Sequence, residues 1–398
     1  MLLAKKIRIN VSRQDANTLE FMQAKCRALY NWHLSQLKSG AKWRLYDAKK
    51  TLQQSRLVDP ELNSVYGKLL HEVFFRLEDA MRGFFRRVKA GETPGFPRYH
   101  ARQKFFTLKY PGMYLRVEGK TLILPTGGRG AHQRFPDIRA ILTEAPPTPF
   151  REVAITQDAT GHYHATFLTE SPDRVPTADD GSAIAYDLGI KTLATGYSTT
   201  GRFLHVGGFT TYRWYNKQLD HLRSLRSRCH KGSRRYRYLT AVYHRVSEKK
   251  RRKQRDSLHK ASAFLARQAE RAIVLGDLSQ QQMVRKPRKS NQRTRGLHRS
   301  VQNEWGLFQF MAMVQYKARR HGKMVYIVSE RYTSTDCSEC GYRQTMPLWK
   351  RTYRCPQCGL VMDRDDNSAR NILARFLARL GPYSADTQND VLSVSSGI

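Results

Sequence analysis

The pattern of hydrophobic and polar positions predicts a first half in which a helical block interrupts a set of short strands. Residues 4–10 alternate between polar and apolar side chains, which is typical of a half-buried strand. From about residue 14 to residue 90 the apolar positions recur at helical spacing, until Gly and Pro residues at 91–98 break the pattern. Further strand patterns lie at 105–108, 115–117, 121–124, 152–156 and 162–169. We therefore expect a small antiparallel β-barrel that the N-terminal strand joins and into which the helices are inserted.

The pattern changes after a polar linker at 172–181, where buried strands begin to alternate with helices. The expected strands lie at 183–190, 193–198, 202–206, 272–278 and 324–328. A long basic helical region at 210–268 separates the third strand from the fourth, and an amphipathic helix at 303–320 precedes the fifth. The spacing assigns the core face of that second helix to Trp305, Phe308, Met311, Met313 and Tyr316. The whole chain is thus predicted to be a multidomain α+β protein whose second half is an α/β domain.

Charge adds a prediction about partners. The chain has 70 Lys and Arg against 33 Asp and Glu, a net charge of +37. Such an excess concentrates polyanions, so nucleic acid is the expected partner, with a merely solvated basic surface as the alternative. Residues 211–260 alone carry 17 basic and 3 acidic side chains, with aromatic residues between them. We expect basic groups of this segment to contact phosphates, while its aromatic rings stack on bases or pack in the core.

No run of apolar residues approaches the roughly 18 that a membrane span needs. The N-terminus also lacks the apolar region and cleavage site of a signal peptide. We therefore expect a cytoplasmic protein without a membrane partner.

Four of the six cysteines form two Cys-x-x-Cys pairs, Cys337 with Cys340 and Cys355 with Cys358, which are separated by 14 residues. Zn²⁺ favours four thiolates in a closed tetrahedral site, so this spacing predicts a structural zinc ion. Free thiols or a redox pair are the alternative. Four thiolates leave no open position for a catalytic water molecule, so catalysis must be sought elsewhere.

Two aspartates stand at the ends of predicted elements. Asp187 ends a buried strand, and Asp365 starts a helix whose next residues are short. Taken singly, the first could form a turn and the second could cap the helix. Together, two carboxylates from separate elements can bind Mg²⁺ or Mn²⁺, and in two-metal nucleases such ligands hold ions about 3.5–4 Å apart. We expect Asp187 and Asp365 to bind a catalytic Mg²⁺ or Mn²⁺, with a third carboxylate to complete the set.

These residues carry a resemblance to a known family. The chain resembles TnpB, the transposon-encoded RNA-guided DNA nuclease related to the type V CRISPR effectors. The motifs are Tyr186-Asp-Leu-Gly-Ile-Lys, Arg255-Asp-x-x-His259-Lys, Trp305-Gly with Tyr316-Lys-Ala, Tyr332 to Gly341, and Cys355 to Ile372. The resemblance covers almost the whole chain and is most specific from 181 to 373.

The resemblance implies a domain organisation for the whole chain. The first part would be a wedge-like β-barrel at 1–12 and 98–175 with a helical recognition insertion at 13–97. The second would be a RuvC nuclease domain of RNase H type at 181–332 and 361–380, a zinc ribbon at 333–360 and a disordered tail at 381–398.

The resemblance also implies a function, namely an RNA-guided DNA endonuclease encoded by a transposable element and associated with a prokaryotic nucleoid. One or two protein copies would bind a guide RNA derived from the transposon end. The complex would then bind double-stranded and single-stranded target DNA, and it would cleave guide-complementary DNA next to a short motif. The expected nucleic-acid contacts are Arg234, Arg235, Arg237, Arg251, Arg252, Lys253, Arg255, His259 and Lys260.

One position departs from the family. Its second catalytic acid is a Glu at the end of the fourth strand, and this chain has Gly276 there, which offers no ligand. The acid could have moved, the protein could be a nuclease-inactive RNA-guided DNA-binding protein, or the residue could have been engineered. We favour a moved acid, with Glu304 as first candidate, Asp277 as second and Glu330 as third. The alternative for Glu304 is a structural role, because a negative charge at a helix N-terminus stabilises the helix by about 0.3–1 kcal/mol.

Overall fold

The structure is a computed structural model that describes residues 1–128, 133–172, 174, 181–189, 192–277, 306–347 and 349–380. The chain divides into two compact units, Met1–Pro172 and Asp173–Ile398. Within the described residues, no helix is both long and apolar enough to cross a membrane. Glu304, Trp305 and the tail at 381–398 lie outside the described residues, so the predictions made for them stay predictions.

The first unit combines three helices with an antiparallel sheet. Its helices are α1 (Arg13–Lys38), α2 (Leu45–Val58) and α3 (Gly67–Lys89), with short 3₁₀ turns at Pro60–Ser64 and Gly112–Tyr114. Its strands are β1 (Leu2–Asn10), β2 (Leu108–Pro111), β3 (Arg116–Glu118), β4 (Thr121–Leu124), β5 (Ile138–Leu142), β6 (Glu152–Gln157) and β7 (Tyr163–Glu170). The strand order is β2-β6-β7-β1-β5-β4-β3, and each pairing is antiparallel. The N-terminal strand therefore does join the later strands, as predicted.

Two details of this sheet differ from the sequence prediction. The stretch at 105–108 is strand only from Leu108 onward, because Phe106 is buried as a loop residue beside Tyr30 and Arg76 rather than paired in the sheet. Strand β5 was missed, although its residues alternate between buried and exposed positions in the pattern of a half-buried strand.

The second unit is built on a five-stranded mixed sheet. Its strands are β8 (Ala183–Leu188), β9 (Thr192–Ser198), β10 (Phe203–Gly207), β11 (Ala272–Asp277) and β12 (Met324–Ser329). The order is β10-β9-β8-β11-β12, in which β8, β11 and β12 are parallel and β9 and β10 are antiparallel to their neighbours. All five strands predicted for this half of the chain are present.

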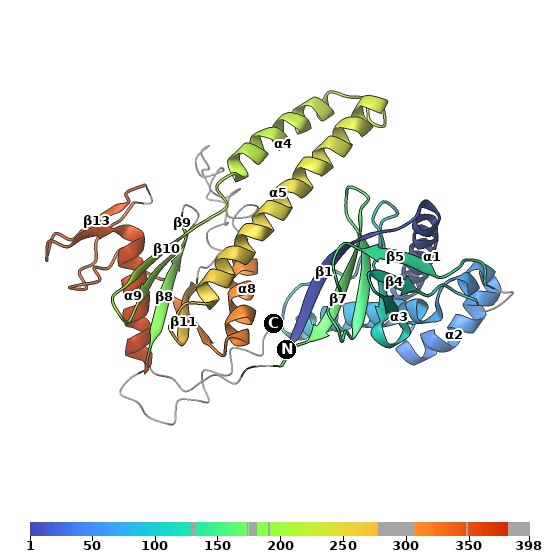
Figure 1. Cartoon of the computed structure of the whole chain (residues 1–398), viewed down its shortest axis with the longest axis horizontal. Coiled ribbons are helices and arrows are strands. Elements are labelled where there is room, and N and C mark those ends of the chain that lie inside the picture. The colour runs from blue at the N-terminus through green and yellow to red at the C-terminus, as the bar shows by residue number, and fades with distance from the viewer. Residues whose placement is uncertain are drawn as a thin grey trace. The chain divides into compact units, whose positions relative to one another are not determined.

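Helices cover both faces of this sheet (Figure 1). On one face, α9 (Arg364–Leu380) packs Ile372, Leu373 and Phe376 against small and β-branched residues of the strands. On the other, the end of α5 (Arg234–Ala266) and α8 (Leu307–Arg320) pack against a second apolar cluster. Helix α4 (Tyr212–Ser227) lies beside α5 as its antiparallel partner, so the basic region predicted as one helical stretch is two helices.

The core face of α8 was predicted incorrectly at one position. Leu307, Phe310 and Val314 are buried at spacings of three and four residues, while the Phe308 side chain is 68% exposed. Since successive helix positions are about 100° apart, a core face that includes 307, 310 and 314 turns 308 to solvent. Met313 is buried as predicted. Lys317 of the same helix fixes α8 to α5, because its Nζ donates to the His259 carbonyl at 2.5 Å.

Candidate functional site

The four predicted cysteines lie together. Cys355 and Cys358 stand in the connection between two short paired strands, β13 (Thr352–Arg354) and β14 (Val361–Asp363), and Cys337 and Cys340 come from the segment that precedes β13; the whole segment 333–363 is called the ribbon below. The sulfur of Cys337 is 3.6 Å from that of Cys358, and the sulfur of Cys340 is 3.6 Å from that of Cys355. Four sulfurs bound at about 2.3 Å to one tetrahedral zinc ion would lie about 3.8 Å apart. The cluster therefore has the composition and the spacing of a zinc site.

The backbone conformation of both Cys-x-x-Cys turns is suited to metal binding. Each Cys-x-x-Cys turn ends in a glycine with positive φ, Gly341 and Gly359, both at 74°. Burial raises the pKa of the Cys355 thiol, but backbone N–H groups of Cys358 and Gln357 more than offset this and lower it to about 7. A thiol with this pKa is readily present as the thiolate that binds zinc.

The ribbon is attached to the N-terminal part of α9 by two asparagine side chains, of which Asn367 is buried and Asn371 is half-buried. Asn371 Nδ2 donates to the carbonyls of Thr333 and Asp336, both at 2.8 Å. Asn367 Nδ2 donates to the same two carbonyls, and its Oδ1 accepts the backbone N–H of Ser338 at 2.9 Å. The start of α9 is therefore positioned by the segment that carries the cysteines.

Asp365 lies in the first turn of α9, and it does not cap the helix. The capping contact is made by Asp363, whose Oδ1 accepts the Asp365 backbone N–H at 2.7 Å. The Asp365 carboxylate instead meets Arg351 from the ribbon, whose Nη1 lies 3.1 Å from each carboxylate oxygen. The capping alternative therefore applies to Asp363, and Asp365 is left for another role.

Asp187 faces the same side of the sheet as α9. Alternate residues of β8, Ala183 and Ala185, belong to the cluster packed on α9, and Asp187 is the next residue in that alternation. Burial raises the pKa of the Asp187 carboxyl to about 8, and the charge of Asp365 is the next contribution. The structure therefore brings the two predicted aspartates within electrostatic reach of one another.

Gly276 and Glu330 lie on this face as well. Gly276 is in register with Val328 of β12, which belongs to the cluster under α9, and Glu330 is two residues beyond Val328. A methyl group built on Gly276 would overlap the Glu330 side chain at Cγ, Cδ and Oε1. The Glu330 side chain therefore occupies the space above Gly276.

The Glu330 carboxyl shares the environment of Asp187. Burial raises its pKa to about 9, with the charges of Asp187 and Asp277 as further causes, while a hydrogen bond from the Leu188 backbone N–H opposes the rise. Its Oε1 atom is buried and has no hydrogen-bond partner among the described residues. Either a proton or a cation can satisfy such an oxygen, and carboxylate oxygens are the donors that Mg²⁺ and Mn²⁺ prefer.

The two ligand clusters differ in how closely their atoms approach. Within the described part of the chain, only the cysteines form a set of three or more ligand groups close enough to share one ion. Asp365 is instead held by Arg351, a contact that the sequence did not indicate. The neighbouring Asp366 is likewise held by His205 of β10, whose Nε2 lies 2.7 Å from Oδ1.

The nine predicted nucleic-acid contacts all lie on α5. Eight are exposed, whereas His259 is half-buried, and burial lowers its pKa. Three have acidic partners on the same helix, since Arg251 and Arg252 pair with Glu248 and Lys260 pairs with Asp256. No acidic partner within the described residues pairs with the remaining five. These five are Arg234, Arg235, Arg237, Lys253 and Arg255.

The aromatic residues of the same segment divide into two groups. Tyr215 is buried, and Tyr243 packs against the guanidinium groups of Arg223 and Arg226 between α4 and α5. Trp214 and Tyr238 are exposed and free to stack on bases.

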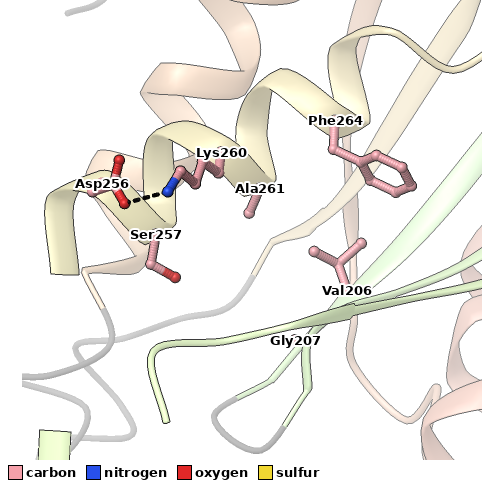
Figure 2. Close-up of a pocket in the computed structure, with 7 residues that line it drawn as sticks. All are labelled: Val206, Gly207, Asp256, Ser257, Lys260, Ala261 and Phe264. Atoms are coloured by element: carbon pink, nitrogen blue, oxygen red, sulfur yellow. Dashed lines mark ion pairs between the residues drawn. The ribbon is translucent and has the colours of Figure 1, made fainter. Parts of the chain in front are cut away.

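Lys260 also lines a groove of about 450 Å³ between α5 and the end of β10 (Figure 2). Val206, Ala261 and Phe264 give the groove an apolar lining. The Lys260 ammonium lies 2.7 Å from the Asp256 carboxylate, so its charge is already paired. We therefore assign no phosphate site to this groove.

Comparison with known proteins matches two family descriptions to the second unit. Residues 166–287 match the family described as "Probable transposase", and residues 308–372 match "Cas12f1-like, TNB domain". The second match spans α8, β12, the cysteine ribbon and the start of α9.

Individual relatives extend the similarity to the first unit. A Streptomyces pristinaespiralis protein named "Putative RNA-guided DNA endonuclease" is 27% identical over 329 residues, which cover 80% of this chain and 73% of that protein. A protein with the same description from Mycobacterium tuberculosis is 27% identical over 301 residues, which cover 72% of this chain and 63% of that protein. A TnpB-like protein of Methanocaldococcus jannaschii is 29% identical over 140 residues, 34% of this chain and 48% of that protein.

A solved structure shares the fold. The protein in the cryo-EM structure of a Cas12f1–sgRNA–target DNA complex superposes with a TM-score of 0.60 at 11% identity. The superposition covers 94% of this chain and 98% of that one. The solved structure shows a shared fold, and the family matches, the relatives and the cysteine ribbon support a relationship between this chain and the TnpB-like proteins.

Proposed function

We propose that this protein is an RNA-guided DNA endonuclease encoded by a transposable element, and that it cleaves DNA by Mg²⁺- or Mn²⁺-dependent RuvC chemistry. The observation that carries the proposal is the meeting of Asp187 and Asp365. These residues are 178 positions apart, yet burial and the charge of Asp365 together raise the pKa of the Asp187 carboxyl. A buried carboxylate near a second carboxylate is costly in a metal-free protein, and a divalent cation relieves that cost, so the arrangement favours a metal site over a structural one.

The sheet supports the nuclease assignment. Asp187 stands near the end of β8, the central strand of the five-stranded sheet, which is where we propose that the metal ion binds. A divalent ion bound there would activate a water molecule and stabilise the leaving oxygen of a phosphodiester. Asp187 and Asp365 would hold the ion, and the ribbon would keep α9, and with it Asp365, at the correct position.

The nucleic-acid partners follow from charge and from the relatives. Guide RNA and target DNA are both polyanions, and the unpaired arginines of α5, with the exposed Trp214 and Tyr238, provide phosphate and base contacts. The named relatives are described as RNA-guided DNA endonucleases. In this proposal the guide derives from the transposon end, pairing with it selects the DNA, and the protein contacts backbone shape.

The test is cleavage by the purified ribonucleoprotein, expressed together with its flanking transposon end. The substrate is guide-matched double-stranded DNA with a randomised flank, in the presence of Mg²⁺ or Mn²⁺. We expect cleavage that depends on the guide and is lost in Asp187→Asn and in Asp365→Asn. Intact DNA in both metals, with the RNA shown to be bound, would overturn the proposal.

Gly276 favours a second candidate, a nuclease-inactive RNA-guided DNA-binding protein, since this residue supplies no carboxylate. That candidate predicts guide-dependent target binding of equal affinity in the wild type and in Asp187→Asn, with no cleavage by either. Cleavage that is present in the wild type and absent in the variant eliminates it. A nucleic-acid-binding accessory to transposition that uses no guide is the third possibility, and copurification of one discrete RNA species would count against it.

A further inference from the structure

We infer that Glu330 supplies the third carboxylate of the nuclease site and that Gly276 is the residue that makes room for it. This inference rests on the proposed function. It replaces our expectation from the sequence that Glu304, which lies outside the described residues, takes this role. Gly276 would then be part of a working site and not the mark of a lost one.

Strand alternation places Glu330 on the catalytic face. β11 and β12 run parallel with Gly276 opposite Val328, so these two residues point to the same face of the sheet. Glu330 is two positions further along and returns to that face. From there its side chain leans back over Gly276, into the space that a side chain at position 276 would fill.

The contacts of Glu330 show where its carboxylate lies. It accepts a hydrogen bond from the backbone N–H of Leu188, the residue that follows Asp187. The same carboxylate is influenced directly by the charge of Asp187. The Glu330 side chain, which follows β12, therefore reaches the end of β8. In the family that position is reached by the Glu of the fourth strand, which is Gly276 in this chain.

The unsatisfied oxygen gives a second, independent indication. Glu330 Oε1 is buried without a hydrogen-bond partner among the described residues, although it lies beside two other acids. A buried polar atom without a partner destabilises the folded chain, and a bound ligand would relieve this cost. A divalent cation bound by both Glu330 and Asp187 would give Oε1 the partner that it lacks. The same cation would also relieve the repulsion between the two carboxylates.

Asp277 fits this role less well than Glu330. It follows Gly276 directly, so alternation directs its side chain to the opposite face of the sheet. Its register partner is Ser329, and it is exposed.

The first test measures metal binding without any cleavage. Mn²⁺ is titrated into the purified full chain and followed by EPR spectroscopy for the wild type, Glu330→Gln and Gly276→Ala. We expect Glu330→Gln to weaken binding by at least about tenfold, the lower bound seen when even an outer-shell partner of a metal ligand is lost. Gly276→Ala should weaken it as well, because the added methyl displaces the Glu330 carboxylate. The control is Glu118→Gln, which removes an exposed acid of β3.

The second test moves the acid back. The double variant Gly276→Glu/Glu330→Gly places a carboxylate on β11 and removes the one on β12. We expect it to regain the Mn²⁺ affinity, and the guide-directed cleavage, that Glu330→Gln loses. Gly276→Ala has no positive φ to strain, and Glu330→Gln preserves side-chain shape, so both should fold, which circular dichroism would verify.

The outcomes separate this inference from the proposed function. Unchanged Mn²⁺ affinity in both Glu330→Gln and Gly276→Ala overturns the inference, whether or not the protein cleaves DNA. If Asp187→Asn abolishes cleavage while Glu330→Gln cleaves normally, the proposed function stands and the inference fails. If Glu330→Gln loses Mn²⁺ binding but the wild type never cleaves, Glu330 is confirmed as a ligand and the endonuclease proposal fails.

Discussion

The cysteine cluster and the carboxylate cluster both place negative charge near one end of α9, but the groups that surround this charge differ between the two clusters. Around the cysteines, backbone N–H groups donate to sulfur and lower the pKa of Cys355, whereas burial and hydrogen bonds among the thiols raise the pKa of Cys358. Around the carboxylates, burial and mutual repulsion raise the pKa values of Asp187 and Glu330. The four cysteine sulfurs lie close enough together to share one ion, whereas among the described carboxylates no such set forms and Asp365 is paired with Arg351.

This difference is what a structural site and a catalytic site require. A structural ion completes a shell that the fold has already assembled, so the protein can satisfy every ligand in advance. A catalytic ion must keep positions open for water and substrate, so its ligands cannot be satisfied by the protein alone. Four predictions follow from this comparison.

The largest effect is expected from the cysteine side. Cys337→Ser should lose zinc, whose binding to such sites is worth about 10–16 kcal/mol, and expose 333–360 to proteolysis. Cleavage should be lost too, because Asn367 and Asn371 lose the carbonyl partners that hold α9. Zinc content, limited proteolysis and RNA affinity are the measurements, and RNA affinity should persist. Cys229→Ser, which lies outside the cluster, is the control and should keep its zinc. Protection of 333–360 in the zinc-free variant would contradict the prediction.

The next effect concerns pH and the carboxylates. The pKa of Asp187 is raised from 3.8 to about 8, so the folded chain binds more protons than the unfolded chain between these values. Stability of the protein without Mg²⁺ or Mn²⁺ should therefore fall as pH rises from about 4 to about 8. Asp187→Asn should remove part of this fall and stabilise the zinc-loaded protein at pH 8 by about 1–3 kcal/mol.

Urea unfolding at pH 5 and pH 8 would measure this effect in wild type and variant. Equal stabilities at pH 8, or a less stable variant, would show that the Asp187 carboxyl is not strained. Added Mn²⁺ should reverse the order, since only the wild type binds the ion fully.

Two glycines sharpen the comparison further. Gly359 has a φ of 74° and open space around its α-carbon, so it is needed for its backbone conformation. Gly359→Ala should cost about 1–2 kcal/mol of stability in the zinc-bound protein, which thermal unfolding would detect. Gly276 has no positive φ, so Gly276→Ala should leave stability nearly unchanged while it lowers Mn²⁺ affinity. Equal stability losses in the two variants would contradict this distinction.

The smallest effect is expected from Arg351, which pairs with Asp365 through a partly exposed ion pair. Arg351→Ala should raise Mn²⁺ affinity about fivefold, equivalent to about 1 kcal/mol, because the guanidinium competes with the ion for Asp365. Arg354→Ala is the matched control, because Arg354 is an exposed arginine of β13 only three residues further along the chain. Weaker Mn²⁺ binding in Arg351→Ala would instead make Arg351 a supporting contact.

The elements that the sequence predicted well are those whose signal is local. The Cys-x-x-Cys spacing located the metal ribbon, and strand periodicity located all five strands of the second unit. The face of α8 was less certain, because aromatic and methionine residues occur on both sides of it and Phe308 is exposed.

The site was harder to predict, because its geometry depends on contacts between distant elements. Motif position identified Asp187 and Asp365, but nothing local showed that Glu330 reaches over Gly276 from the next strand. The pairing of Arg351 with Asp365 was also hidden, since it depends on how the ribbon folds against α9. The register of β11 with β12 would have been the useful signal. Side chains from two adjacent parallel strands can reach the same place at the end of the sheet, so an acid following β12 can replace one on β11.

The proximity of Gly276 and Glu330 also bears on how such proteins diverge. An ancestor with Glu at both positions could keep one carboxylate in the site while the other turned to solvent, so either could be lost without loss of activity. A Glu codon becomes a Gly codon by one base change, which makes loss at position 276 a short step once Glu330 is present. If Glu330 is the third ligand, the residue at position 276 alone does not decide whether such a chain has a complete set of carboxylates, and the residue two positions beyond Val328 should be examined with it.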